Sequence, residues 1–337
     1  MSRFWGWAAV LLLVAVLSGC LYMGSLMGLA FSVCQANGEI PAAEREAIGD
    51  EARAFVQLIR DGETEAALRS MSTEGRAAAQ RIAMLNLTEA TLQRPPAALD
   101  LRDVFKLTSI GSERGMAPCP DESGTAFLAR GGGLQSMFVT LAEPVPGGEH
   151  TWTFWFEREQ GAWRVRGVHL GLSALGDRDG ARLWALATEQ RNKGNVFNST
   201  ALYDLANLTF NRGAFLQAAE ANGFASERQL YRRHPDITES RFRVSGRVFP
   251  VAIMNATALA DGRFILVLEQ RADEPVAITE AEARNRALID GINAERAEWR
   301  EVFDGLSVAY PTGPNRVWRT LYLRESGYAT PAEAPQN

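Results

Sequence analysis

The chain has 337 residues, of which 46% are hydrophobic and 22% are charged, as in globular proteins large enough for two domains. Its net charge of −5 provides no general attraction to nucleic acid, so a nucleic-acid partner is not expected. The three histidines, His150, His169 and His234, lack the spacing of metal ligands, and the sequence has no Cys-x-x-Cys pair. No metal, cofactor or catalytic residue is therefore predicted.

The first 36 residues are almost free of charge. Arg3 is the single charged residue among them, and the apolar run from Trp7 ends in Leu17-Ser18-Gly19-Cys20. This layout resembles the lipobox of a bacterial lipoprotein signal peptide, in which the cysteine becomes the lipidated first residue of the mature chain. The resemblance implies a periplasmic protein of the cell envelope that is held to a membrane by lipid on Cys20.

Apolar residues continue beyond Cys20 as far as Val33, which leaves a second interpretation open. A bilayer core about 30 Å thick needs about 20 apolar residues, so residues 1–36 also suit an uncleaved membrane-spanning helix. A soluble exported protein is a third interpretation. With Arg3 as the only flanking charge, the N-terminus is expected in the cytoplasm. Both membrane-bound forms then place residues 37–337 outside the cytoplasm.

The chain has three cysteines, Cys20, Cys34 and Cys119. Lipidation of Cys20 leaves one pair, and the oxidising exterior of a cell favours a disulfide between Cys34 and Cys119. Two separate thiols are the alternative, because a sequence does not give the distance between the two residues.

Residues 40–173 are predicted to form an α+β domain of helices followed by a curved antiparallel sheet. Helical spacing of apolar residues, such as Phe55, Val56 and Ile59, predicts the first helix, and Pro95-Pro96 ends the helical part. A Gly- and Pro-containing loop carrying Cys119 is expected between the first strand and the next two. The predicted helices cover 42–61, 63–71 and 74–86; the strands cover 101–110, 125–130 and 134–142, and a hairpin joins 150–159 to 162–172.

Two stretches of this domain resemble a known fold. Ala54-Phe55-Val56 with Asp61-Gly62-Glu63, and the stretch Gly161-Ala162-Trp163-Arg164-Val165, look like the opening helices and the closing strand of the nuclear-transport-factor-like, or SnoaL-like, cone fold. The resemblance implies a cone that contains a pocket. That family includes isomerases, dehydratases and non-enzymatic binding modules, so the fold alone does not decide the function.

Aromatic residues of the hairpin are the candidate pocket lining. Trp152, Trp155 and Trp163 suit the mouth of such a cone, whereas packing of the core is the alternative role for all three. Trp163 is expected to be mostly buried between the hairpin and the first helices.

Residues 177–325 are predicted to form a second α+β domain. It begins with a helical hairpin, whose two helices are separated by Gly194 and Asn195, and the tail of residues 326–337 is expected to be loose. The predicted helices cover 178–192, 199–211, 213–222 and 279–303, and the strands cover 241–257, 263–271, 306–310 and 316–324.

The sequence thus favours a membrane-tethered extracytoplasmic module of the bacterial envelope that binds an envelope protein or a small apolar ligand. The alternative is a hydrolase or isomerase that uses an apolar, aromatic-lined cone. A buried Asp, Glu or His facing an apolar pocket beside Trp152 or Trp163 would favour the enzyme.

Overall fold

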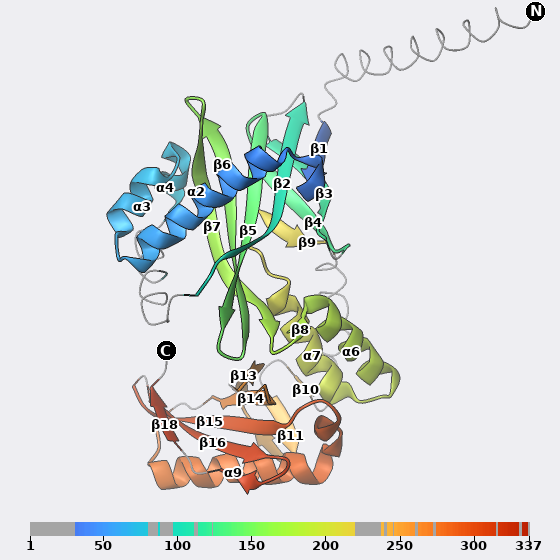
Figure 1. Cartoon of the computed structure of the whole chain (residues 1–337). Helices are drawn as coiled ribbons and strands as arrows, with labels where there is room; N and C mark the ends of the chain where they lie inside the picture. The colour runs from blue at the N-terminus through green and yellow to red at the C-terminus, as the bar shows by residue number, and fades with distance from the viewer. Residues whose placement is uncertain are drawn as a thin grey trace, which may run out of the picture.

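The computed structural model shows a mixed α+β protein (Figure 1). It describes residues 31–79, 87, 97–110, 114–122, 124–219, 237–238, 241–244, 246–259, 262–271, 274–314, 316–329 and 332–335. Cys20, the predicted lipidation site, lies outside these residues, as does the rest of 1–30. No helix within the described ranges is long and apolar enough to cross a membrane.

A strongly curved antiparallel sheet forms the first half of the protein. The predicted hairpin is present with a turn at Gln160-Gly161, where both residues have the positive φ that such turns require. In spatial order, the sheet contains β1 (Phe31–Ala36), β2 (Asp100–Ile110), β5 (Gln135–Val145), β6 (Gly148–Glu159), β7 (Ala162–Leu175) and β8 (Arg178–Asp179).

Three helices cover one face of this sheet: α2 (Ala42–Arg60), α3 (Thr64–Ser70) and α4 (Thr73–Ala78). The predicted apolar stripe of α2 is buried, and Phe55 meets Phe154 of β6 edge to face at 5.6 Å between ring centres. Alternate residues of a strand point to opposite faces, so Trp152 and Phe154 join this core while Thr151 and Thr153 face the other side.

A three-stranded sheet covers the second face and corrects two predictions. It contains β3 (Arg114–Pro120), β4 (Ala126–Gly132) and β9 (Leu216–Ala218). Residues 111–124 were expected to be a loop, yet 114–120 form a strand at the edge of this sheet. Proline has no backbone N–H to donate, and an edge strand tolerates it because one side of the strand has no neighbour to bond. Residues 213–222 were expected to be helical, yet 216–218 pair with β4, because tertiary pairing outweighs local preference in so short a segment.

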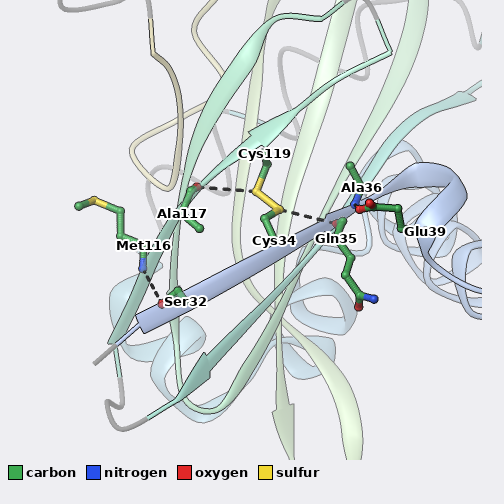
Figure 2. The surroundings of a disulfide bond; sticks show 8 residues. All are labelled: Ser32, Cys34, Gln35, Ala36, Glu39, Met116, Ala117 and Cys119. Carbon is green, nitrogen blue, oxygen red and sulfur yellow. Dashed lines mark hydrogen bonds between the residues drawn. A yellow bond between two sulfur atoms is a disulfide. The ribbon is translucent and has the colours of Figure 1, made fainter. Parts of the chain in front are cut away.

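A disulfide joins the two sheets at their edges (Figure 2). Cys34 of β1 and Cys119 of β3 are bonded, with their Cα atoms 5.6 Å apart. Cys119 is fully buried. The pairing that the sequence left open is therefore present, and it fixes β1 against the layer that covers the second face.

A helical hairpin of α6 (Gly180–Asn192) and α7 (Val196–Thr209) connects the two halves, as Figure 1 shows. Asp179 caps α6 by accepting a hydrogen bond from the Arg182 backbone N–H at 2.8 Å. A single apolar cluster runs from Phe105 of β2 through Leu202 of α7 to Leu266 of the second half. The chain thus leaves the first sheet near the predicted boundary at 177, but the hydrophobic core continues across it.

The second half contains a mixed sheet backed by the predicted long helix, α9 (Ile278–Glu295). β14 and β15 are parallel and are connected through α9 and the 3-10 helix Ala297–Glu301, whereas the other neighbours are antiparallel. The sheet contains β13 (Val251–Ala258), β14 (Phe264–Gln270), β15 (Gly305–Gly313), β16 (Arg316–Leu323) and β17 (Gly327–Tyr328); a small separate sheet contains β10 (Ile237–Thr238), β11 (Arg241–Val244) and β12 (Arg247–Phe249).

The C-terminal tail differs from the prediction of a loose segment. β17 pairs with β16, and β18 (Ala332–Pro335) pairs with the opposite part of the same strand. The backbone of β16 offers a free ladder edge there, which the tail occupies despite its prolines.

Candidate functional site

Trp152 belongs to the interior of the first core. It is fully buried, and its indole Nε1 donates to Glu143 Oε2 at 2.7 Å. The other carboxylate oxygen of Glu143 accepts from Arg60 Nη2 of α2 at 2.9 Å. A buried carboxylate therefore does lie beside Trp152, but an arginine and an indole already occupy both of its oxygens.

Trp155 and Trp163 lie in two other environments. Trp155 points to the opposite face from Trp152 and packs against Phe138 and Phe215, at 6.3 and 5.9 Å between ring centres. Trp163 is partly buried at the edge of the first core, and the Arg158 guanidinium lies 4.8 Å from its ring centre. The three tryptophans therefore do not line one pocket. Trp163 packs against the buried cluster that joins the hairpin to the first helices, as expected, and keeps a smaller part of its surface exposed beside the β6–β7 turn.

A polar hollow lies instead at the far end of the second face, where β2 and β6 begin and β7 ends. It encloses about 190 Å³ between the first sheet, the β3–β4 turn and the segment that follows α7. None of the three tryptophans lines it. Its charged lining residues are Arg102, Asp103, Asp121, Glu122, Glu149, Asp179 and Arg212.

The carboxylates of the hollow are held by neighbouring side chains. Asp103 accepts from Asn37 Nδ2 and from Thr140 Oγ1, both at 3.1 Å. Glu149 accepts from Ser173 Oγ at 3.0 Å and from Arg102 Nη2 at 2.7 Å. These bonds fix the orientation of each carboxylate, and because a carboxylate can accept about four hydrogen bonds, each keeps capacity for a further donor.

Arg212 lies among these carboxylates. Its Nη1 donates to the backbone carbonyls of Thr209, at 2.6 Å, and Asn211, at 3.3 Å, and its guanidinium lies 5.9 Å from the ring centre of Phe127. Nε and Nη2 of Arg212 donate to no atom of the described residues. Burial lowers the pKa of Arg212 and the attraction of Asp103 and Glu149 opposes that shift, so the group stays charged.

Two further polar side chains belong to this region. The buried Thr151 of β6 lines the hollow. His169 of β7 hydrogen-bonds to the backbone of Asn211, and its Nε2 is buried with no partner among the described residues. Burial, helped by the positive charge of Arg212, lowers the pKa of His169, so its ring is neutral near pH 7.

The hollow has an excess of negative charge. Five carboxyl groups and two guanidinium groups line it, so its net charge is −3 when all are ionised. The described part of the chain contains no group of three His, Cys, Asp or Glu residues arranged to hold a metal ion. The arrangement instead suits a small molecule that carries both an anionic group and positive or hydroxyl groups.

Sequence reasoning missed this site. Asp103, Glu149 and Arg212 are far apart in the chain, and none belongs to a motif. Asn211-Arg212-Gly213 gives only a weak sequence signal, that of a turn. Gly213 does have the positive φ that favours glycine in a turn.

No protein-family model, no curated protein and no solved structure matches this chain.

Proposed function

We propose that the protein is a membrane-tethered extracytoplasmic binding module and that its ligand enters the polar hollow. The observation that carries this proposal is the Arg212 guanidinium, which lies among four carboxylates and has two nitrogen atoms that donate to no acceptor within the described residues. Arg212 lines the hollow, so an acceptor group on a ligand can take hydrogen bonds from these two nitrogen atoms.

The lining residues determine the chemistry of the ligand. A carboxylate or phosphate on the ligand pairs with Arg212, while an ammonium group or hydroxyls pair with Asp103 and Glu149. The volume of about 190 Å³ is smaller than the roughly 300–1,000 Å³ of sites for drug-sized molecules. An amino acid or an amino sugar acid has the required size and charges. The ligand is thus polar, in contrast to the apolar ligand that the sequence favoured.

The extracytoplasmic location has one structural support. The Cys34–Cys119 disulfide suits an oxidising compartment such as the periplasm. Residues 31–36, which the sequence assigned to the anchor, form β1 instead, so the membrane tether in this proposal is Cys20 or the apolar segment that precedes β1. Intact-mass measurement of protein extracted from membranes tests the two forms: a lipidated chain beginning at Cys20 supports the lipoprotein, and a chain retaining Met1 supports the spanning helix.

The first half has a cone-like fold in this proposal. Helices packed on a strongly curved antiparallel sheet support it. The rival enzyme, a hydrolase or isomerase with an aromatic-lined apolar cone, loses its main support because Trp152, Trp155 and Trp163 lie apart. Glu143, the carboxylate beside Trp152, is paired with Arg60 and belongs to the core.

Ligand binding is tested on the purified full chain. We expect thermal-shift screening of amino acids and amino sugar acids to find a stabilising ligand, and isothermal titration calorimetry to measure its affinity. Arg212→Gln should weaken that affinity by about 10- to 100-fold, because hydrogen bonds to charged groups contribute about 1.5–3 kcal/mol. Thr151→Val, which removes a neutral hydroxyl at nearly constant volume, should weaken it by about 2- to 10-fold.

The control is Arg247→Gln, because Arg247 is an exposed arginine on β12, outside the hollow. Circular dichroism should show that each variant is folded. A ligand that binds equally well to Arg212→Gln, or a complete screen without a stabilising compound, would contradict the proposed site.

A further inference from the structure

One end of the first sheet exposes an unusual number of large apolar side chains. Phe31, Val33, Ile110, Met116 and Leu134 are between 42% and 71% exposed, and we call these five residues the apolar rim. The other exposed large apolar residues of the described ranges, Leu208, Val248 and Ile278, are scattered over α7, β12 and α9.

The backbone brings the members of the rim together. Phe31 of β1 is the direct cross-strand partner of Ile110, at the end of β2. The backbone N–H of Ser109, next to Ile110, donates to the carbonyl of Leu134 at 2.9 Å.

On the other side of β1, the Met116 backbone N–H donates to Oγ of Ser32, the residue after Phe31, at 3.2 Å (Figure 2). The rim therefore surrounds one end of the two layers.

The chain enters the structure at this same end. Residues 4–30 contain no charged residue and are followed directly by Phe31, without a polar spacer. If the chain begins at Cys20, the residues between that cysteine and Phe31 span at most about 36 Å when fully extended. A lipid or helix anchored in a membrane thus keeps the rim close to the bilayer.

We propose that the apolar rim contacts the lipid bilayer, an inference that rests on the membrane tether of the proposed function. Exposed apolar groups gathered at one place mark an interaction surface, and their position next to an apolar anchor selects lipid as the partner. Arg130, the cross-strand neighbour of Met116, is exposed and suits the anionic headgroups at the same depth.

The test uses photo-crosslinking of the full chain in bacterial membranes. Benzoylphenylalanine replaces Leu134 or Phe31, the cells are irradiated, and intact mass identifies the adducts. We expect a mass increase of one phospholipid at both positions. The matched control carries the same probe in place of Val248, an apolar residue of β12 outside the rim that is 47% exposed, close to the 42% of Phe31, and should give no lipid adduct.

A second variant tests the apolar character of the contact. Leu134→Glu should lose most of the lipid adduct formed by a probe at Phe31, while the protein stays in the membrane fraction. Leu134 is 71% exposed, so this change leaves the core intact.

The competing partners give different products. An adduct with a second copy of the chain at either rim position would show that the open edge of β1 pairs with itself, and would overturn the proposal. Lipid adducts of equal yield at positions 134 and 248 would overturn it too. Membrane fractionation is scored separately: a membrane-bound chain without lipid adducts refutes the rim alone, whereas a soluble chain refutes the tether as well.

Discussion

At the scale of single residues, the most buried charges of the first half are structural. Glu143 is 1% exposed, and it is fixed by Arg60 from α2 and by the indole of Trp152. This triad joins the first helix to the sheet through polar bonds inside an apolar core. Removing one member leaves the others buried without a partner, which costs more than the pair itself contributes.

Glu143→Ala should therefore lower the free energy of unfolding by about 3–5 kcal/mol. The control is Glu74→Ala, because Glu74 pairs with Arg166 at 3.0 Å but is 76% exposed, and surface pairs contribute about 0–1 kcal/mol. Urea denaturation followed by circular dichroism measures both. Similar losses in the two variants would show that Glu143 is not the buried anchor described above.

His169 makes the stability depend on pH. Burial and the nearby Arg212 lower its pKa in the folded protein below the ordinary histidine value of 6.5, so the unfolded chain binds a proton first as the pH falls. The stabilising effect of the neutral ring is complete above about pH 7 and is lost as the pH falls through and below 6.5. Carboxylates such as Glu282 and Glu301, whose pKa values are lowered in the folded protein, change the stability only below about pH 4.5.

The measurement is urea unfolding at pH 7.5 and at pH 5.5. Wild type should lose more stability between these values than His169→Gln, in which the titrating group is absent. An identical change in both proteins would exclude His169 as the source.

At the scale of elements, the Cys34–Cys119 disulfide fixes β1 covalently to β3. The short strand β1 lies at the edge of its sheet and pairs with only one neighbour there, β2. The bond closes a loop with a sequence separation of 85, and chain entropy assigns to such a loop about 4–5 kcal/mol before strain. We expect dithiothreitol to lower the melting temperature of wild type and to raise hydrogen exchange in β1 first. The double variant Cys34→Ala/Cys119→Ala should already have the lower melting temperature and should not respond to dithiothreitol. A wild-type melting temperature unaffected by full reduction would contradict this role.

Elements with a strong period were predictable, and elements made by tertiary pairing were not. The stripe of Phe55, Val56 and Ile59 predicted α2, and the alternation along the β6–β7 hairpin predicted both of its strands. β3 alternates buried and exposed positions as well, but the inward residues are small, such as Gly115 and Ala117, so hydrophobicity gave no signal. β9 exists only because β4 offers it an edge.

The same contrast applies to the sites. The anchor was predicted from neighbouring residues alone, namely the single charge of Arg3 and the apolar run that follows it. A targeting signal is a local sequence pattern, so its prediction needs no information about the fold. The polar hollow needed Asp103, Glu149 and Arg212 to converge from three distant segments, which a single sequence does not reveal. The tryptophans were misplaced in the prediction because their shared hydrophobicity concealed the opposite directions of Trp152 and Trp155 on one strand.

At the scale of the whole molecule, α7 makes the two halves one folding unit. Leu202 and Ala206 are fully buried in the cluster that reaches both sheets. We expect calorimetry of the full chain to show a single transition, and Leu202→Ala to shift it as a whole by destabilising the protein by about 2–5 kcal/mol. Leu208→Ala, at an exposed position of the same helix, is the control and should have little effect. Two separable transitions would show that the halves fold independently.

The polar hollow and the apolar rim lie at opposite ends of β2. Asp103 precedes Ile110 by seven residues, which corresponds to about 24 Å along an extended strand. The electric field of a charged bilayer decays over a Debye length of about 8 Å at physiological ionic strength. With the rim on the membrane, the hollow lies about three such lengths away. The salt in the surrounding water therefore sets how strongly a charged ligand binds there, and a change in the proportion of anionic lipid leaves its affinity unaltered.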